Sequence, residues 1–285
     1  MNLLRLLLLT AGFISSLLST ALAAPSTEIT WYGQSAFRIT TPSGKVLYMD
    51  PWINNPGNSK GKEILAAIKK ADLVLVTHGH FDHVGDSTEI AKKTGAQLVA
   101  SFDLGKAMVQ YGGFPEKQFG FGTTGNFGGE VSLLDGEVKV AFVPALHSSS
   151  IEPPANSSYP RGLQYAGNPG GVVVSIKNGP TIYHTGDTDL FSDMALVKEY
   201  GKVDIMMVCI GDRFTMGPRR AAMAVKLVSP DLAIPMHFGA LPILTGTAPE
   251  FVAEAKKASP ATTIKVLQVN ETFSWPQAKL TMQTK

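Results

Sequence analysis

The chain has 285 residues, of which 44% are hydrophobic and 17% are charged, and its formal net charge at pH 7 is +2. This length and balance are typical of one globular domain, or of one domain built from two similar halves. The basic residues are scattered, which argues against a nucleic-acid-binding protein. The single cysteine, Cys209, excludes an intramolecular disulfide.

The amino-terminal residues have the order of a secretory signal peptide. Arg5 supplies the basic end, an apolar stretch runs from Leu6 to about Leu18, and residues 21–23 supply the small-x-small pattern of a cleavage site. We therefore predict a cleaved signal peptide over residues 1–24 and a periplasmic or secreted protein.

The mature chain, residues 25–285, is then predicted to form a single domain. An uncleaved membrane anchor is the alternative, because residues 6–27 carry no charge and are long enough to span a bilayer. Serine and threonine residues at 15, 16, 19 and 20 dilute this stretch. We therefore expect no stable membrane span after cleavage.

In the first half of the mature chain, short β-rich runs alternate with helical patterns. The runs predict strands at residues 29–32, 36–40, 46–49 and 73–76. Apolar residues at helical spacing predict helices at 64–71 and 86–94. Asp86 and Glu89 give the second helix a start that is like a capping box.

The second half continues the alternation after a Gly- and Phe-rich loop at 111–129. A segment rich in Pro, Asn, Ser and Gly at 148–171 predicts a long loop, and loops of that length are usually functional. Strands are predicted at 131–134, 138–143, 172–176, 181–184, 203–210 and 232–235, and helices at 191–200, 218–228 and 247–258. This order indicates sheets packed together, with helices on the outer faces.

A cluster of metal-ligand residue types follows the buried strand at 73–76. The segment His78-Gly79-His80-Phe81-Asp82-His83 holds three histidines and one aspartate. Imidazole nitrogens and carboxylate oxygens are ligands for zinc and similar divalent ions, whereas in an apolar core each would need a polar partner. A solvated polar loop is the alternative, but the density of ligand types favours a metal site.

The other histidines extend this pattern. His147, His184 and His237 each lie at or just beyond the end of a predicted buried strand. Rigid strand ends can bring ligands from distant parts of the sequence to one point. We therefore expect the histidines to converge.

The series His78-x-His80-x-Asp82-His83, then His147, Asp187 and His237, resembles the metal motifs of the metallo-β-lactamase superfamily. It is most similar to the metal-dependent hydrolase branch related to L-ascorbate-6-phosphate lactonase. The resemblance extends from about residue 31 to residue 251 and includes the segments 31–35, 50–52, 145–149, 183–188, 214–218, 235–238 and 244–247. It implies an α/β (α+β) fold over residues 25–285: a four-layer αββα sandwich with the site at one edge of the paired sheets.

The resemblance also implies a ligand set for two divalent metal ions, with zinc as the first expectation and manganese or iron as alternatives. It assigns His78, His80 and His147 to the first ion, Asp82, His83 and His237 to the second, and Asp187 to both. Asp50 resembles an aspartate that hydrogen-bonds the ligand loop. A simple turn former before Pro51 is the alternative for Asp50.

The implied mechanism is attack by a metal-bridged hydroxide on an ester, lactone or phosphodiester bond. Asp82, His184 and Asp187 are the expected catalytic residues. Asp82 would orient the hydroxide or pass its proton on. His184 lies outside the ligand set, and three roles remain open for it: an orienting residue, a proton donor to the leaving group, or an ordinary buried histidine.

The function expected from these features is that of an exported, dinuclear, metal-dependent hydrolase. An envelope phosphodiesterase of the phospholipase D type and a non-catalytic metal-binding protein are the alternatives. The best-known zinc β-lactamases use a cysteine on the second metal, where this chain is expected to have Asp187. That difference argues against β-lactam hydrolysis.

The expected partner is a small-molecule substrate, and the sequence leaves its charge open. Arg213 follows a predicted strand and would bind an anionic group if its side chain reached the site. A solvated surface arginine is the alternative reading. We expect no nucleic-acid partner, and the sequence does not determine the oligomeric state or whether the 148–171 loop contacts substrate.

Overall fold

The computed structural model describes residues 26–155 and 157–276. The predicted signal peptide therefore lies outside the described residues. Within them, none of the helices has the length and apolar character needed to cross a membrane.

The fold is built on two seven-stranded mixed sheets. In the first sheet the strands lie in the order β16 (Thr272–Pro276), β1 (Ser26–Trp31), β2 (Phe37–Thr40), β3 (Val46–Met49), β4 (Leu73–Leu75), β5 (Gln97–Ser101) and β6 (Thr124–Gly125). In the second sheet the order is β15 (Thr263–Ile264), β14 (Leu232–Met236), β13 (Ile205–Cys209), β12 (Thr181–His184), β11 (Gly170–Ile176), β8 (Val138–Pro144) and β7 (Glu130–Leu133).

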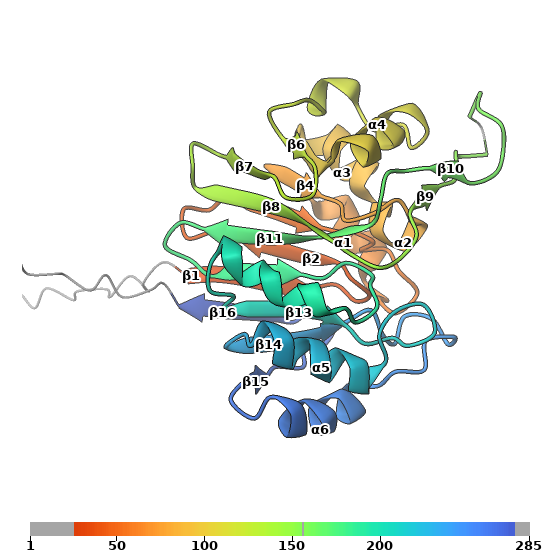
Figure 1. Cartoon of the computed structure of the whole chain (residues 1–285). Helices are drawn as coiled ribbons and strands as arrows, with labels where there is room; N and C mark the ends of the chain where they lie inside the picture. Colours follow the sequence, from red (N-terminus) through yellow and green to blue (C-terminus); the bar gives the residue numbers. More distant parts are fainter. Residues whose placement is uncertain (1–25, 156, 277–285) are drawn as a thin grey trace, which may run out of the picture.

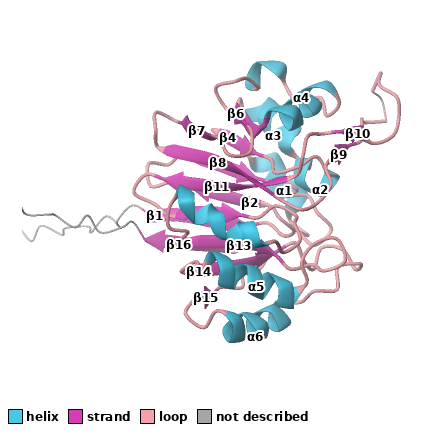
Figure 2. Ribbon diagram, viewed as in Figure 1, coloured by secondary structure: helices cyan, strands magenta, loops and turns pink. Residues whose placement is uncertain are grey.

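Helices cover the outer sides of this pair of sheets, and strands lie between them (Figure 2). On the side of the first sheet lie α1 (Gly61–Ala67), α2 (Phe81–Val84), α3 (Ser87–Thr94), α4 (Phe102–Gln110) and the 3₁₀ turn η1 (Glu116–Gln118). On the side of the second lie η2 (Ser192–Tyr200), α5 (Pro218–Val228) and α6 (Ala248–Ala258). This is the αββα sandwich that the resemblance to the metallo-β-lactamase superfamily implies.

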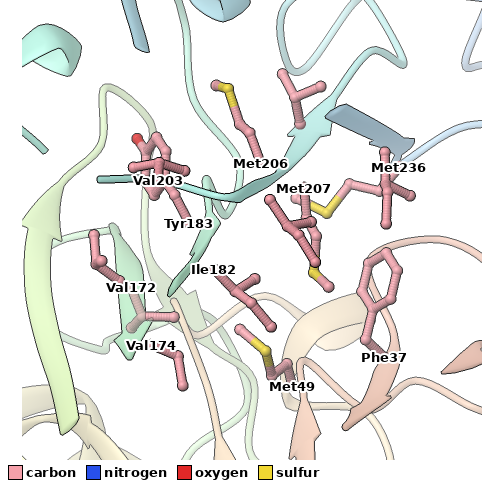
Figure 3. Packing of buried hydrophobic residues seen from close by; sticks show 14 of the residues in the cluster. Phe37, Met49, Val172, Val174, Ile182, Tyr183, Val203, Met206, Met207 and Met236 are labelled. Carbon is pink, nitrogen blue, oxygen red and sulfur yellow. The ribbon is translucent and has the colours of Figure 1, made fainter. Parts of the chain in front are cut away.

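The central strands are buried on both faces, which explains their unbroken apolar runs. In β4, Leu73 and Leu75 belong to the core between the sheets, whereas Val74 packs with the helices on the outer face. Figure 3 shows the inner core, where Phe37 and Met49 of the first sheet lie near Ile182 of the second. Tight packing of this kind holds the strand ends rigid.

Several predicted helices are confirmed, and the exceptions have local causes. Helix α5 spans the predicted residues 218–228, and Thr247 caps α6 by accepting a hydrogen bond from the backbone of Glu250. The helix predicted at 64–71 is wrong after Ala67, because Ile68 turns to extended backbone (ψ 121°). The helix at 86–94 begins without a side-chain cap: Asp86 accepts from the backbone N–H of Asn54 instead.

The predicted helix at 191–200 is a 3₁₀ helix, η2. Its buried residues, Met194 and Val197, are three apart, and the flanking Phe191 and Tyr200 also pack against the core. This spacing matches the three residues per turn of a 3₁₀ helix rather than the 3.6 of an α-helix.

The long loop predicted at 148–171 contains a small two-stranded ribbon, and its last residues already belong to β11. The ribbon pairs β9 (Ser150–Ile151) with β10 (Gln164–Tyr165). It projects beyond the sheets at the same end of the molecule as α2 (Figure 1). The segment therefore stands beside the carboxyl ends of the parallel strands.

Candidate metal centre

Sheet topology brings the candidate ligands to one edge. Strands β3, β4 and β5 are parallel in the first sheet, and β12, β13 and β14 are parallel in the second. Strand β8 is antiparallel to β11, which is antiparallel to β12, so β8 runs in the same direction as β12. The residues that follow β4, β8, β12 and β14 therefore meet, as we expect from the histidine positions.

The first ligand group consists of three histidines. His80 Nδ1 lies 3.0 Å from His78 Nε2 and 3.3 Å from His147 Nε2. His78 is fully buried, whereas His80 and His147 are half-buried at the cavity surface. Three imidazole nitrogens thus face a common point.

The second ligand group contains Asp82, His83, Asp187 and His237, all buried. His237 Nε2 lies 2.9 Å from Asp187 Oδ2 and 3.3 Å from Asp82 Oδ2. His83 Nε2 lies 3.2 Å from Asp187 Oδ1. The structure therefore brings together all seven residues named as ligands from the sequence, in the two sets that the resemblance implies.

Asp187 lies between the two groups. Its Oδ2 atom is 3.7 Å from His147 Nε2 in the first group and 2.9 Å from His237 Nε2 in the second. The tight turn at Gly186 places it there: the backbone has φ +59°, and a Cβ atom would lie 2.4 Å from the Gly170 carbonyl oxygen. Only glycine fits this turn.

Asp50 holds two of the histidines in orientation. Its Oδ2 accepts hydrogen bonds from His83 Nδ1 (2.7 Å) and from the Thr77 hydroxyl (2.6 Å), and its Oδ1 accepts from the Thr77 backbone N–H (2.8 Å). Because the Thr77 hydroxyl donates its proton to Asp50, it must accept from His78 Nδ1, 3.1 Å away. In both histidines the Nε2 atom is then free to face the site. This is the orienting role expected of Asp50.

Gln34 is a further site residue, to which the sequence assigns no role. Its amide Nε2 donates to Asp82 Oδ2 at 3.0 Å, and its backbone carbonyl accepts from the His237 N–H at 2.9 Å. The residue is fully buried and has φ +49°. It connects two ligands of the second group, but a glutamine in a sequence has no ligand chemistry that would single it out.

His184 lies behind the ligands rather than in the cavity. Its Nε2 atom donates to the Ser35 carbonyl oxygen at 3.1 Å, and its Nδ1 atom accepts from the Gly186 N–H at 3.1 Å. Both nitrogens of this fully buried ring are therefore engaged with backbone. Of the three roles left open by the sequence, the geometry favours that of an orienting residue, because the bond to Gly186 supports the turn before Asp187.

Charge and burial determine the pKa values of the metal-free site. Burial and the neighbouring charge of His83 lower the pKa of His78 well below its usual range. Burial alone would lower the pKa of His237, but Asp187 outweighs it and raises that pKa to about 9. Burial alone would raise the pKa of Asp82, but His83 and His237 lower it to about 2. A proton on His237 thus balances carboxylate charge when no cation is bound, and metal binding must displace it.

The residue types and the buried atoms without partners fit divalent metal ions. His83 Nε2 and Asp187 Oδ1 face each other at 3.2 Å, and neither of these buried atoms forms a hydrogen bond, although buried polar atoms are normally paired. Both point into the second group, where a cation would satisfy them. Imidazole nitrogens and carboxylate oxygens suit zinc, and they also suit manganese or iron.

A cavity of about 360 Å³ opens over the ligands. It is lined by Gln34, His80, Phe81, Asp82, His147, Ser148, Ser150, Leu163, Asp187, Phe214, His237, Leu241 and Leu244. Residues of the 148–171 segment thus contribute to the wall. Arg213 is exposed and is not among the lining residues; its guanidinium lies over the Phe214 ring, 5.7 Å from the centroid.

Cys209 is not part of the centre. It is fully buried in β13, and its sulfur makes a 3.6 Å hydrogen bond to the Thr188 carbonyl. Burial raises the pKa of its thiol to about 11. The thiol is therefore protonated and inert, as expected of a core cysteine.

Comparison with known proteins agrees with this geometry. A family model described as the beta-lactamase superfamily domain matches residues 28–237. A UPF0173 metal-dependent hydrolase of Thermodesulfovibrio yellowstonii is 61% identical over 87% of this chain and 91% of its own. One from Anaeromyxobacter dehalogenans is 47% identical over 82% of each chain. The solved structure of Igni18, a metallo hydrolase from Ignicoccus hospitalis, superposes with a TM-score of 0.73 and 30% identity, over 89% of this chain and 100% of that one.

Proposed function

Because this chain belongs to the metallo-β-lactamase superfamily and, within it, to the UPF0173 metal-dependent hydrolases, we propose that it is an exported dinuclear hydrolase of ester, lactone or phosphodiester bonds. The observation that carries the dinuclear proposal is the position of Asp187 Oδ2 between the two ligand groups. His78, His80 and His147 would hold one ion, Asp82, His83 and His237 the other, and Asp187 both.

Two divalent ions bound there would lower the pKa of a water molecule and polarise the bond that is attacked. The chain's own residues supply orientation. Asp82 lies in the cavity wall, with Oδ2 fixed by Gln34, and is placed to accept a hydrogen bond from the attacking water. His184 and Asp50 keep the ligand loops in place from behind.

The cavity over the ligands favours turnover over metal storage. A storage site gains nothing from space above its ligands, whereas a hydrolase needs room for a substrate and a water molecule. The volume of about 360 Å³ lies within the range of small-molecule pockets. We therefore expect catalysis rather than passive metal binding.

The dinuclear proposal predicts two tightly bound ions per chain. Metal-free protein reloaded with excess zinc, manganese or iron and then desalted should contain about two ions per chain by elemental analysis, with native mass spectrometry as a second readout. A maximum of one ion with every metal would contradict the dinuclear centre and leave a mononuclear one.

The bridging role of Asp187 predicts that Asp187→Ala loses the second ion and at least about 10²-fold in kcat, the scale of losing an electrostatic contribution at a reaction centre. Asp189→Ala is the matched control, because Asp189 is half exposed and its carboxylate contacts the Arg220 guanidinium and the Leu190 backbone N–H at the surface. The control should keep both ions and full activity. Normal metal content and kcat in Asp187→Ala would exclude the bridge.

A further inference from the structure

The cavity over the metal ligands is rimmed by exposed apolar side chains. Phe81 is 68% exposed, Leu163 75% and Phe214 53%, and all three line the cavity. Apolar side chains that gather around one concave opening indicate a binding surface, whereas single exposed ones do not. The buried Leu244 and the partly buried Leu241 continue the apolar wall.

These side chains come from three separate segments, and Phe81 and Phe214 each contact a neighbouring side chain. Phe81 is the first residue of α2 and packs edge-on against Trp52, with ring centroids 5.3 Å apart. Leu163 precedes β10, and Phe214 follows β13 beneath the Arg213 guanidinium. Because three segments that are far apart in the sequence supply the apolar rim, the fold of the site creates it. It does not arise from a single hydrophobic stretch.

Lysine and arginine side chains, by contrast, do not line this cavity anywhere in the described part of the chain. The polar lining beyond the metal ligands consists of Gln34, Ser148 and Ser150, all neutral. Selective binding of phosphate or carboxylate groups normally uses arginine or lysine. The Arg213 guanidinium lies over the Phe214 ring and is not part of the cavity lining. Its position therefore gives no support to the hypothesis that Arg213 binds an anionic group of the substrate.

We infer that the site selects uncharged esters or lactones whose acyl part is an apolar chain of about four to eight carbons, a size that a cavity near the lower end of the small-molecule range accommodates. This inference rests on the proposed function. In the reaction, the oxygen of water bonds to the acyl carbon, the bond from that carbon to the alkoxy oxygen breaks, and the alcohol leaves with a proton. The apolar chain lies against Phe81, Leu163 and Phe214.

The first test compares three 4-nitrophenyl esters with the same reacting bond on the metal-loaded enzyme. They are the acetate, the hexanoate, and the half-ester of adipate, which places a carboxylate at the end of the six-carbon chain. We expect kcat/KM for hexanoate to exceed that for acetate by at least about tenfold, since each fully buried methylene contributes up to about fourfold. Hexanoate should exceed the adipate half-ester by a similar factor.

The second test removes the rim. Leu163→Ser and Phe214→Ser should lower kcat/KM for hexanoate by about five- to tenfold and leave acetate within about twofold, because a short acyl group does not reach the rim. Leu196→Ser is the matched control: Leu196 is 58% exposed on η2 and is not among the residues that line this cavity. It should change neither substrate.

Two kinds of failure can be separated. Hydrolysis with no dependence on chain length, or a preference for the adipate half-ester, overturns the inference and leaves the proposed hydrolase intact. Absence of turnover with all three esters overturns the proposed ester chemistry instead. In that case ligand-observed NMR with 2-heptanone, an uncharged ligand that cannot be hydrolysed, decides the inference: binding that Leu163→Ser weakens supports it, and equal or absent binding rejects it.

Discussion

At the scale of single residues, side chains outside the seven candidate ligands hold those ligands in orientation. Asp50 fixes His83 directly and His78 through Thr77. It does so from a backbone with φ +42°, which is uncommon for a residue other than glycine. A strained conformation persists only where the surroundings enforce it, and here three hydrogen bonds to the carboxylate do so.

Substitution of Gln34 tests how much a side chain that orients a candidate ligand contributes to the site. Gln34→Leu keeps the side-chain volume and removes the donor to Asp82 Oδ2. We expect about a 10- to 100-fold loss in affinity for the second metal or in kcat, the usual effect of removing a partner that orients a ligand. Metal titration and kinetics measure the two effects separately.

Gln34→Met is the companion variant, because it keeps the unbranched, uncharged shape but also removes the donor. If the loss in Gln34→Leu reflects packing alone, Gln34→Met should keep metal affinity near that of the wild type. Similar losses in both variants, with thermal melting near that of the wild type, would assign the effect to the hydrogen bond.

At the scale of elements, the sequence predicts best where one pattern decides the structure. Residues 218–228 form the predicted helix because proline at its first turn and an apolar stripe agree. The ligands converge because the strands before them are buried and parallel, which apolar runs indicate.

Prediction fails where tertiary context decides. Strand β5 and helix α4 are not predicted, since Gln97–Ser101 is a short run and the glycine at 105 interrupts the helical pattern. That glycine is needed for packing, because a Cβ atom there would lie 2.3 Å from the Phe119 ring. Strand β16 is also missed, because it is formed by pairing with β1 from the opposite end of the chain. The role of Gln34 depends on contacts of this long-range kind.

At the scale of the whole molecule, export remains a prediction of the amino-terminal pattern. Arg5, the leucine-rich stretch and residues 21–23 predict a mature terminus at Ala24 or Pro25. N-terminal sequencing of the protein from a periplasmic or secreted fraction should recover one of these residues. Recovery of Met1 from cytosolic material would overturn both the cleavage and the compartment.

The proposed metal ligands also come from both halves of the sandwich. His78, His80, Asp82 and His83 follow strand β4 of the first sheet, whereas His147, Asp187 and His237 follow strands of the second. Ions held by both sets would bind the folded chain and not the unfolded one, and so they would stabilise the fold by mass action. At 100 times the dissociation constant this amounts to about 2.7 kcal/mol for each ion, or about 5–10 °C in Tm per ion for a chain of this size.

The metal-free and the metal-loaded form should also respond differently to pH. In the metal-free protein the pKa of His237 is about 9, above its ordinary value of 6.5. The stability that its proton contributes is complete below pH 6.5 and is lost as pH rises through 9. Metal binding displaces such protons and strengthens as pH rises. Differential scanning calorimetry at pH 6.5 and pH 9 should therefore show that the Tm of the metal-free form falls. The difference in Tm between the loaded and the metal-free form should increase over the same range. A difference in Tm that is constant or decreases as pH rises would contradict metal binding at His237.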